Sequence, residues 1–344
     1  MAVSDFGVLP DGRPVRRLRL GRAPGPVLSV LDLGATVQGL AVTCGDGERR
    51  EVVLGQGSVE DYLASTDYLG STVGRYANRI AAGRFPLDGQ EVQVGVNDRG
   101  NHLHGGPDGF DGRLWQVEEH SDSHARLTLE SPDGDQGFPG TLLAGVRYDV
   151  LEDRVVIALE ARTDAPTVVN LTNHAYVNLD GVGRGTVDDH ELTVHADEYT
   201  PVDADGIPLG DHATVTGTPF DLREATRLGS VVRSGHEQVA AVRGVDHNFV
   251  LRGEGMRPAA VLTSRRTATT MELHTDQPGL QVYTGNFLDG SRPSATGGRY
   301  RQGDGIALEP QLFPDTPNHP AWPSAVLRPG EVYRASIEWR FGTS

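Results

Sequence analysis

The chain has 344 residues, 37% of them hydrophobic, and a mean hydropathy of -0.35, a composition typical of a globular protein with a buried core. The net charge is -16, all 31 basic residues are arginines and no basic block occurs, which argues against nucleic acid as a partner. No apolar run approaches the ~18 residues that cross a membrane, the N-terminus lacks a secretory signal pattern, and the single Cys44 allows no internal disulfide. We therefore expect a cytoplasmic protein with no membrane partner.

Short segments rich in Val, Leu, Thr and Tyr follow one another along the whole chain. Several alternate apolar with polar residues, which predicts half-buried strands at 26–34, 125–131, 153–163, 190–200, 279–286 and 333–341. Between them lie Asp-Gly pairs, which suit tight turns, at 46–47, 88–89, 133–134, 205–206 and 289–290. The pattern predicts an all-β fold, either an antiparallel sandwich or a barrel.

Only brief helices are expected. Ser58 is a candidate N-cap with Asp61 three residues later, and residues 234–242 could form another helix. The segment 217–238 is the best candidate for an excursion from the sheet. No repeat, linker or shift in composition marks a boundary, so we expect one domain over residues 1–344, with two domains as the alternative.

Two histidines, His102 and His104, stand one residue apart. In an extended chain their side chains would share a face and could chelate a metal. Asp108 follows them, as a carboxylate follows the His-x-His of the cupin metal motif, and residues 327–339 are similar to the second cupin motif. However, Tyr333 occupies the place of that motif's last histidine. We therefore expect no metal site.

The residues around the histidines favour a functional role over that of ordinary turn or surface residues. Asn101 precedes them, and Gly105 and Gly106 follow directly. This arrangement suggests a backbone in an unusual conformation, which lets a ligand approach closely.

A second polar cluster, residues 170–181, interrupts a strand-like run with Asn173, His174, Tyr176 and Asn178. Amide, imidazole and phenol groups together are typical of a sugar-binding cleft, where they make paired hydrogen bonds and ring contacts. The alternative is a buried polar network that braces the end of a strand.

Two further segments carry charged candidates. In 74–85, Asn78 stands beside Arg79, and in 307–323 Glu309 lies in an apolar run before a proline-rich loop. A lone carboxylate among apolar residues is costly to bury without a purpose. The alternatives are a surface ion pair for the arginine and a water-facing strand edge for the glutamate.

Together these segments resemble the aldose 1-epimerase (galactose mutarotase) family, over about residues 10 to 342. The matching motifs, in the family's order, are "GRYANRIAAGRF", "NHLHGGPDGFDGRLW", "SPDGDQGFPG", "LTNHAYVNLDG", "VDHNFVL", "GLQVYTGNFLDG" and "ALEPQLFPDTPN". The resemblance implies a large antiparallel β-sandwich, the galactose mutarotase-like supersandwich, with a few short helices. It also implies an isomerase of hexose metabolism that interconverts the α and β anomers of free glucose and galactose, without a metal or organic cofactor.

The motifs carry the family's functional residues onto this chain one by one. The general base matches Glu309, the general acid matches His174, and the second active-site imidazole matches His104. The sugar-contacting positions match Asn78, Arg79, His104, Tyr176, Asp246 and Gln281. His102 falls outside the functional set. The implied partner is a free monosaccharide, and we expect a monomer or a weak dimer.

The chemistry of the two catalytic groups fits these roles. Burial in an apolar strand would raise the pKa of Glu309 and improve it as a base, and a small upward shift would let His174 carry a proton at pH 7. A hexose-6-phosphate 1-epimerase is an alternative, but it would need an arginine cluster beyond Arg79. A non-catalytic sugar-binding module on the same fold is another, although it has no need of an acid–base pair.

Overall fold

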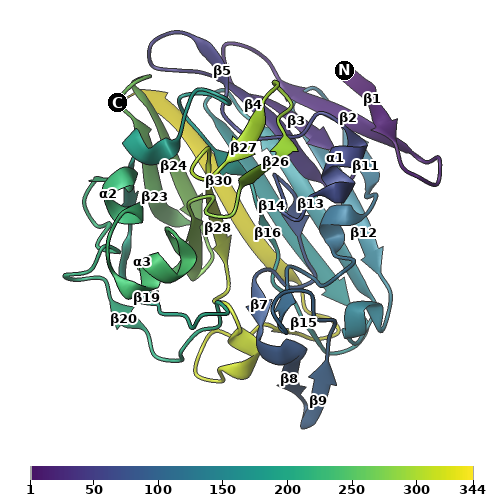
Figure 1. The fold of residues 1–344 in the computed structure, drawn as a ribbon. Coiled ribbons are helices and arrows are strands. Elements are labelled where there is room, and N and C mark those ends of the chain that lie inside the picture. Colours follow the sequence, from purple (N-terminus) through teal and green to yellow (C-terminus); the bar gives the residue numbers. More distant parts are fainter. Residues whose placement is uncertain (1, 344) are drawn as a thin grey trace.

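Most strands of the computed structural model, which describes residues 2–343, belong to three antiparallel sheets (Figure 1). The largest sheet has nine strands in the spatial order β11 (Gln116–His120), β12 (His124–Ser131), β13 (Leu142–Val150), β14 (Arg154–Thr163), β30 (Tyr333–Thr343), β24 (Thr269–Thr275), β23 (Arg257–Ser264), β18 (Glu191–Val194) and β21 (Thr226–Arg227). The second sheet runs β17 (Tyr176–Val177), β28 (Ile306–Gln311), β25 (Gly279–Tyr283), β22 (Asp246–Leu251), β19 (Ala196–Thr200) and β20 (Ala213–Thr214). The third consists of β1 (Ala2–Val8), β2 (Pro14–Gly21), β3 (Val27–Leu31), β4 (Thr36–Thr43) and β5 (Arg49–Glu51).

Five strand pairs complete the β-structure of the described residues. They are β10 (His102–Leu103) with β7 (Arg79–Ile80), β16 (Thr172–Asn173) with β6 (Thr72–Val73), β15 (Thr167–Val168) with β29 (Val326–Leu327), β26 (Asp289–Pro293) with β27 (Arg299–Arg301), and β8 (Arg84–Leu87) with β9 (Gln90–Gln93). The first two pairs carry or flank predicted site residues.

The nine-stranded sheet is the framework of the molecule. Along β14 buried residues alternate with partly exposed ones, as expected for a strand with one face on the core. The last strand, β30, pairs with β14 on one side and β24 on the other, and so joins the two halves of the sheet (Figure 1). Its buried residues and those of all three sheets share one core cluster, which includes Leu18, Ile157, Leu308 and Ile337.

The strand β28 is buried along its whole length, because it is covered on both faces. Ile306 and Leu308 belong to the main core, whereas Ala307 belongs to a separate cluster on the other face. Since side chains alternate along a strand, Glu309 shares the face of Ala307 rather than that of the core. Its partner in the neighbouring strand β25 is Gln281. The fold thus places a row of polar side chains on the outer face of this sheet.

The helices are short, as expected. They are α1 (Val59–Ala64), α2 (Leu228–Val232) and α3 (Glu237–Val242), with 3₁₀ turns at Ala81–Gly83, Phe110–Gly112, Asp135–Gly137, Val187–Asp189 and Thr316–Asn318. Ser58 caps α1 by accepting a hydrogen bond from the backbone N–H of Asp61. None of the helices in residues 2–343 has the length and apolar character that crossing a membrane requires.

The predicted strands are confirmed with two adjustments. Residues 190–200 form two strands, β18 and β19, because the chain leaves the ladder at His195. The segment 217–238 is only partly an excursion, since β21 adds a short strand to the edge of the large sheet before α2 begins. The glycine of each predicted Asp-Gly turn has a positive φ, although the pair at 289–290 opens β26 rather than a separate turn.

Candidate active site

A cavity of about 500 Å³ opens on the outer face of the six-stranded sheet, beside the β7–β10 pair. All eight predicted site residues line it, from six separate motifs: Asn78, Arg79, His104, His174, Tyr176, Asp246, Gln281 and Glu309. The remaining lining residues are Thr66, Asp67, Tyr68, Asp98, Arg99, Leu103, Tyr283, Phe287, Asp289, Ser291 and Arg292.

Glu309 and His174 form a buried pair on the cavity wall. Glu309 Oε1 lies 3.5 Å from His174 Nε2, and Glu309 Oε2 has no hydrogen-bond partner among the described residues. Desolvation, supported by the nearby charge of Asp246, raises the pKa of Glu309 well above its ordinary value, against an opposing effect of Arg79. This confirms the direction expected for a glutamate in an apolar strand.

The expected upward pKa shift of His174 is wrong. Desolvation lowers the pKa of His174 to about 4, although a backbone hydrogen bond and the charge of Asp246 act in the other direction. The physical reason is burial, which disfavours a charged imidazole as it disfavours a charged carboxylate. Burial therefore favours the neutral imidazole of His174 and the protonated carboxyl group of Glu309.

His104 is held as a neutral hydrogen-bond donor. The backbone N–H of Asn78 donates to His104 Nδ1 at 3.1 Å, so the proton of the neutral ring is on Nε2. Desolvation, and then the charges of His174, Arg79 and His102, lower the pKa of His104 well below its ordinary value. The ring lies 5.3 Å from that of His174 and 4.6 Å from that of Tyr68 between centroids.

The backbone at His104 is unusual, as the flanking residues suggested. His104 has a φ of +51°, and Gly105 and Gly106 have φ values of +96° and +91°. A Cβ at Gly105 would lie 1.9 Å from the carbonyl oxygen of Gly74, so the glycine permits a close approach of two backbone segments. The sequence suggested that a ligand approaches the backbone closely here, whereas in the structure another segment of the chain does so. This contact sets the position of His104.

His102 does not line the cavity and is not part of the cluster of His104, His174 and Glu309. Its Nδ1 lies 2.7 Å from the carbonyl oxygen of Gly95, and its ring packs edge-on against Phe138. The two histidines do not share a face because β10 ends at Leu103 and the positive φ of His104 turns the chain.

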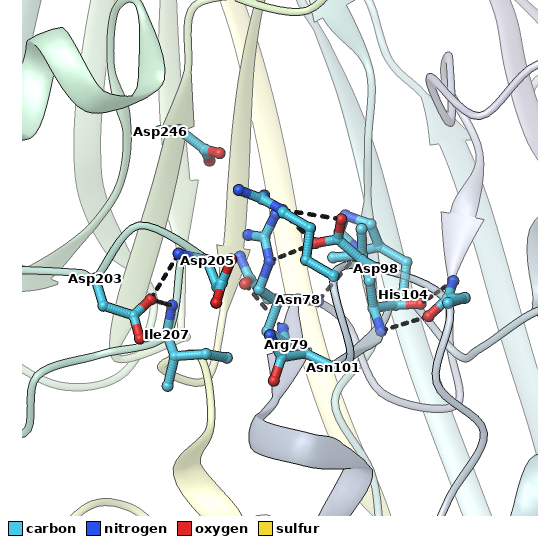
Figure 2. A network of polar contacts seen from close by, with 12 residues as sticks. Asn78, Arg79, Asp98, Asn101, His104, Asp203, Asp205, Ile207 and Asp246 are labelled. Atoms are coloured by element: carbon cyan, nitrogen blue, oxygen red, sulfur yellow. Dashed lines mark hydrogen bonds and ion pairs between the residues drawn. The ribbon is translucent and has the colours of Figure 1, made fainter.

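Arg79 begins β7 at the edge of the cavity, and Asn78 directly precedes it. Asn78 Oδ1 accepts a hydrogen bond from the backbone N–H of Arg79, and Arg79 Nε donates to Asp98 Oδ2 at 2.9 Å (Figure 2). The predicted alternative of an ion pair for Arg79 is therefore partly correct, but the pair is inside the cavity wall and the arginine is buried.

Asp246, Gln281 and Tyr176 contribute the polar floor of the cavity from β22, β25 and β17. Gln281 Nε2 donates to Asp246 Oδ1 at 2.7 Å, and Tyr176 donates its hydroxyl proton to the carbonyl oxygen of Asp67. Gln281 Oε1 is buried without a hydrogen-bond partner in residues 2–343. A buried acceptor of this kind fits a ligand that carries hydroxyl groups.

Several lining residues were not singled out from the sequence. Tyr68 and Tyr283 surround the imidazole of His174 with aromatic rings, and Phe287 stacks on Tyr283 at the exposed rim. Asp98 holds Arg79. Only Asp98 had a local signal, because it opens the turn-like run 98–101, Asp-Arg-Gly-Asn, shortly before His104.

The trio His104, His174 and Glu309 is compact enough to surround a metal ion. One ligand-type atom of each lies within 4.8 Å of the others. However, the hydrogen bond from Asn78 occupies Nδ1 of His104 and leaves the ring proton on Nε2, whereas a metal ligand needs a free lone pair there. The donor set therefore suits hydrogen bonding to a sugar better than metal ligation.

Comparison with known proteins identifies the family of the chain. The family model described as Aldose 1-epimerase matches residues 16–340. The chain is 43% identical to the aldose 1-epimerase of Escherichia coli over 337 residues, covering 96% of each chain, and 40% identical to the galactose mutarotase of Bos taurus over 341 residues, covering 98% of each. The crystal structure of galactose 1-epimerase from Lactobacillus acidophilus is similar with a TM-score of 0.87 and 32% identity, covering 100% of this chain and 98% of the other.

The match extends over nearly the whole chain in sequence and in fold, and it includes every motif that contributes to the cavity. The chain therefore belongs to the aldose 1-epimerase family.

Proposed function

We propose that this isomerase interconverts the α and β anomers of free hexoses such as glucose and galactose in the cavity around Glu309. The observation that carries the proposal is the buried pair of Glu309 and His174, a carboxyl and an imidazole 3.5 Å apart in a cavity lined by amide, phenol and charged groups. A sugar bound between such groups has a base for one oxygen and an acid for another.

In the proposed reaction Glu309, as carboxylate, takes the proton from the C1 hydroxyl, and the C1–O5 bond breaks as His174 gives a proton to O5. The open-chain aldehyde rotates about C1–C2, and the ring recloses with the two proton transfers reversed. The required charged pair differs from the neutral pair that burial favours by the movement of a single proton from Glu309 to His174. Hydrogen bonds from sugar hydroxyls to the carboxylate would favour that movement, because they replace the lost solvation.

The remaining predicted residues orient the sugar in this proposal. His104 donates from Nε2, Arg79 and Asp246 offer charged contacts, and Asn78, Tyr176 and Gln281 offer neutral ones. Holding C1 and O5 between the catalytic groups is the positioning part of the catalysis.

The two alternatives lack support of this kind. Five acidic side chains line the cavity, Asp67, Asp98, Asp246, Asp289 and Glu309, against three arginines, and two of the arginines are bound to Asp98. This balance disfavours the phosphate of a hexose-6-phosphate. A purely sugar-binding module would gain nothing from burying a glutamate with a raised pKa.

Polarimetry with freshly dissolved α-D-galactose and α-D-glucose tests the proposal. The wild type should accelerate anomer interconversion, Glu309→Gln should abolish it while galactose binding stays measurable by calorimetry, and His174→Asn should lose about 10²–10⁴-fold. The exposed Glu91→Gln on β9 is the matched control and should be as active as the wild type. Near-normal turnover of Glu309→Gln would refute the base, and a mild effect of His174→Asn would transfer the acid role to His104.

The proposal also takes a free monosaccharide as the partner, a monomer or weak dimer as the assembly, and the cytoplasm as the location. The names of the relatives support the first, and the single, buried and unpaired Cys44 supports the last.

A further inference from the structure

Two backbone turns far apart in the sequence meet at the guanidinium of Arg79. The first is residues 98–101, in which Arg99 and Gly100 have φ values of +46° and +83°, the signs of a type I′ turn. Backbone hydrogen bonds between Asp98 and Asn101 close it, and Asn101 Oδ1 accepts from the backbone N–H of Ala82. The carboxylate of Asp98 is therefore held on a rigid support.

The second turn is residues 203–207, on the opposite side of Arg79 from Asp98 (Figure 2). Asp203 organises it, because its Oδ1 accepts from the backbone N–H groups of both Asp205 and Ile207. A Cβ at Gly206 would lie 2.8 Å from Arg79 Nη1 and 2.9 Å from its Cζ, so the bare backbone of Gly206 packs on the guanidinium.

Arg99 ties the two turns together. Its Nε donates to Asp98 Oδ1 at 3.3 Å, and its Nη1 donates to the carbonyl oxygen of Ala204 at 2.9 Å. Asp98 uses its other oxygen for Arg79 Nε, at 2.9 Å. Burial raises the pKa of Asp98, but Arg79 and Arg99 outweigh it and hold the pKa below its usual range, so the carboxylate is charged at neutral pH.

These contacts leave the two terminal nitrogens of the Arg79 guanidinium free to bind a ligand. Within residues 2–343 its Nη1 and Nη2 make no hydrogen bond, although the side chain is buried and lines the cavity. A guanidinium offers donors in a fixed plane, so fixing Nε and one face of the group determines where the two terminal nitrogens point.

We propose that Asp98 and the turn at 203–207 are positioning elements, which fix the guanidinium of Arg79 so that its terminal nitrogens bind the sugar. The inference rests on the proposed function and extends it to residues that do not themselves act on the reacting atoms. Both elements act through Arg79, so their loss should weaken sugar binding more than it slows the chemical steps.

The test begins with Asp98→Asn, which keeps the shape of the side chain and removes its charge. Loss of a charge-assisted hydrogen bond to the arginine should raise KM for galactose roughly 10-fold or more and change kcat less than about threefold. In an Arg79→Ala background the same change should have no further effect on KM. Asp88→Asn, which removes the acid of the exposed Arg328–Asp88 pair, is the matched control and should leave KM unchanged.

Gly206→Ala tests the second turn independently. Its φ is +81°, and the new methyl group would displace the flexible end of Arg79 rather than backbone, so the protein should fold and KM should rise. Gly89→Ala has the same backbone strain, with a φ of +79°, but nothing within 4 Å of the added Cβ, and should leave KM unchanged.

Two outcomes would overturn the inference. One is an unchanged KM in Asp98→Asn or Gly206→Ala with a reduced fraction of active enzyme, which is the result of a merely structural role. The other is a KM increase of the same factor in the Arg79→Ala background. Calorimetric measurement of galactose affinity in the same variants separates this test from the proposed function. If the wild type binds galactose but does not interconvert its anomers, the proposed activity is refuted. Weaker galactose binding in Asp98→Asn would still support the positioning role in that case.

Discussion

Glu309 shows how one buried side chain links stability to chemistry. The residue is 1% exposed, its Oε2 has no hydrogen-bond partner in the described residues, and its pKa is raised by desolvation. A buried carboxyl group with an unpartnered oxygen destabilises the folded state. Such a group is typical of a functional site, where the rest of the structure compensates for the lost stability.

This predicts that Glu309→Gln stabilises the protein while it abolishes activity. A carboxyl group whose pKa is higher in the folded than in the unfolded state contributes stability that is fully present below the unfolded pKa and is lost as the pH rises through the folded pKa. The neutral amide does not titrate. We therefore expect the melting temperature of Glu309→Gln to exceed that of the wild type at pH 8, by a margin that shrinks towards pH 5.

Thermal unfolding at both pH values measures this difference. Glu91→Gln, which replaces an exposed carboxyl group, should show no pH-dependent gain. An equal melting temperature of Glu309→Gln and wild type at pH 8 would contradict the prediction.

At the scale of elements, the site depends on short segments that end abruptly. The strands β7, β10, β16 and β17 have two residues each, and predicted site residues begin or directly follow them. His104 leaves β10 through a positive φ, and the backbone of Gly105 packs on that of Gly74. The position of the imidazole is therefore determined by the contact between two loops rather than by a long strand.

Gly105→Ala should accordingly disrupt both the fold around His104 and the activity. The added Cβ would lie 1.9 Å from a backbone oxygen at a φ of +96°, so the two segments must separate. We expect a loss of roughly 3 kcal/mol or more in the free energy of unfolding, together with a large loss of anomerase turnover.

Gly12→Ala is the matched control for that experiment. Its φ is +88° and nothing lies within 4 Å of the added Cβ, so it should cost only about 1 kcal/mol and leave turnover unchanged. Equal denaturant midpoints for the two variants would show that the backbone contact at Gly105 does not matter.

At the scale of the whole molecule, several histidines are buried in neutral form. Desolvation lowers the pKa values of His102 and His174 to about 4 and that of His247 to about 3. His247 is satisfied as a neutral ring, because its Nδ1 accepts from the backbone N–H of Asp246 and its Nε2 lies 3.1 Å from Gln238 Oε1.

These histidines predict an acid-sensitive protein. The unfolded chain takes up protons below a pKa of about 6.5, whereas the folded chain does so only near 4 or below, so their contribution to stability is present above pH 6.5 and is lost as the pH falls. At pH 5 each of the three histidines should lower the free energy of unfolding by about 2 kcal/mol relative to neutral pH. Glu309 has the opposite sign and offsets part of this loss.

Denaturant unfolding between pH 7 and pH 4.5 measures how steeply the free energy of unfolding falls with pH. His247→Gln should reduce the slope, whatever its effect on stability at pH 7, because one proton-binding site of the unfolded state is removed. A free energy of unfolding that is constant over this range would contradict the prediction.

The sequence by itself determined the all-β fold, most strands and the cap of α1, and its motifs pointed to eight residues that line one cavity. The alternation of apolar and polar residues follows directly from the two faces of a strand, as in β14, and the motifs around Glu309, His174 and His104 are contiguous in the chain. Such features depend on near neighbours, so they can be read without coordinates.

Only the tertiary structure decided the direction of the pKa shift of His174, the tautomer of His104 and the contacts that support the site. The pKa of His174 moved down rather than up because segments distant in the sequence bury it, and the tautomer of His104 follows from a hydrogen bond to Asn78 across 26 residues. The contact of Arg79 with Asp98 and Gly206 likewise joins turns about 100 residues apart. Burial and long-range contacts are properties of the packed chain, and no local pattern of residue types encodes them.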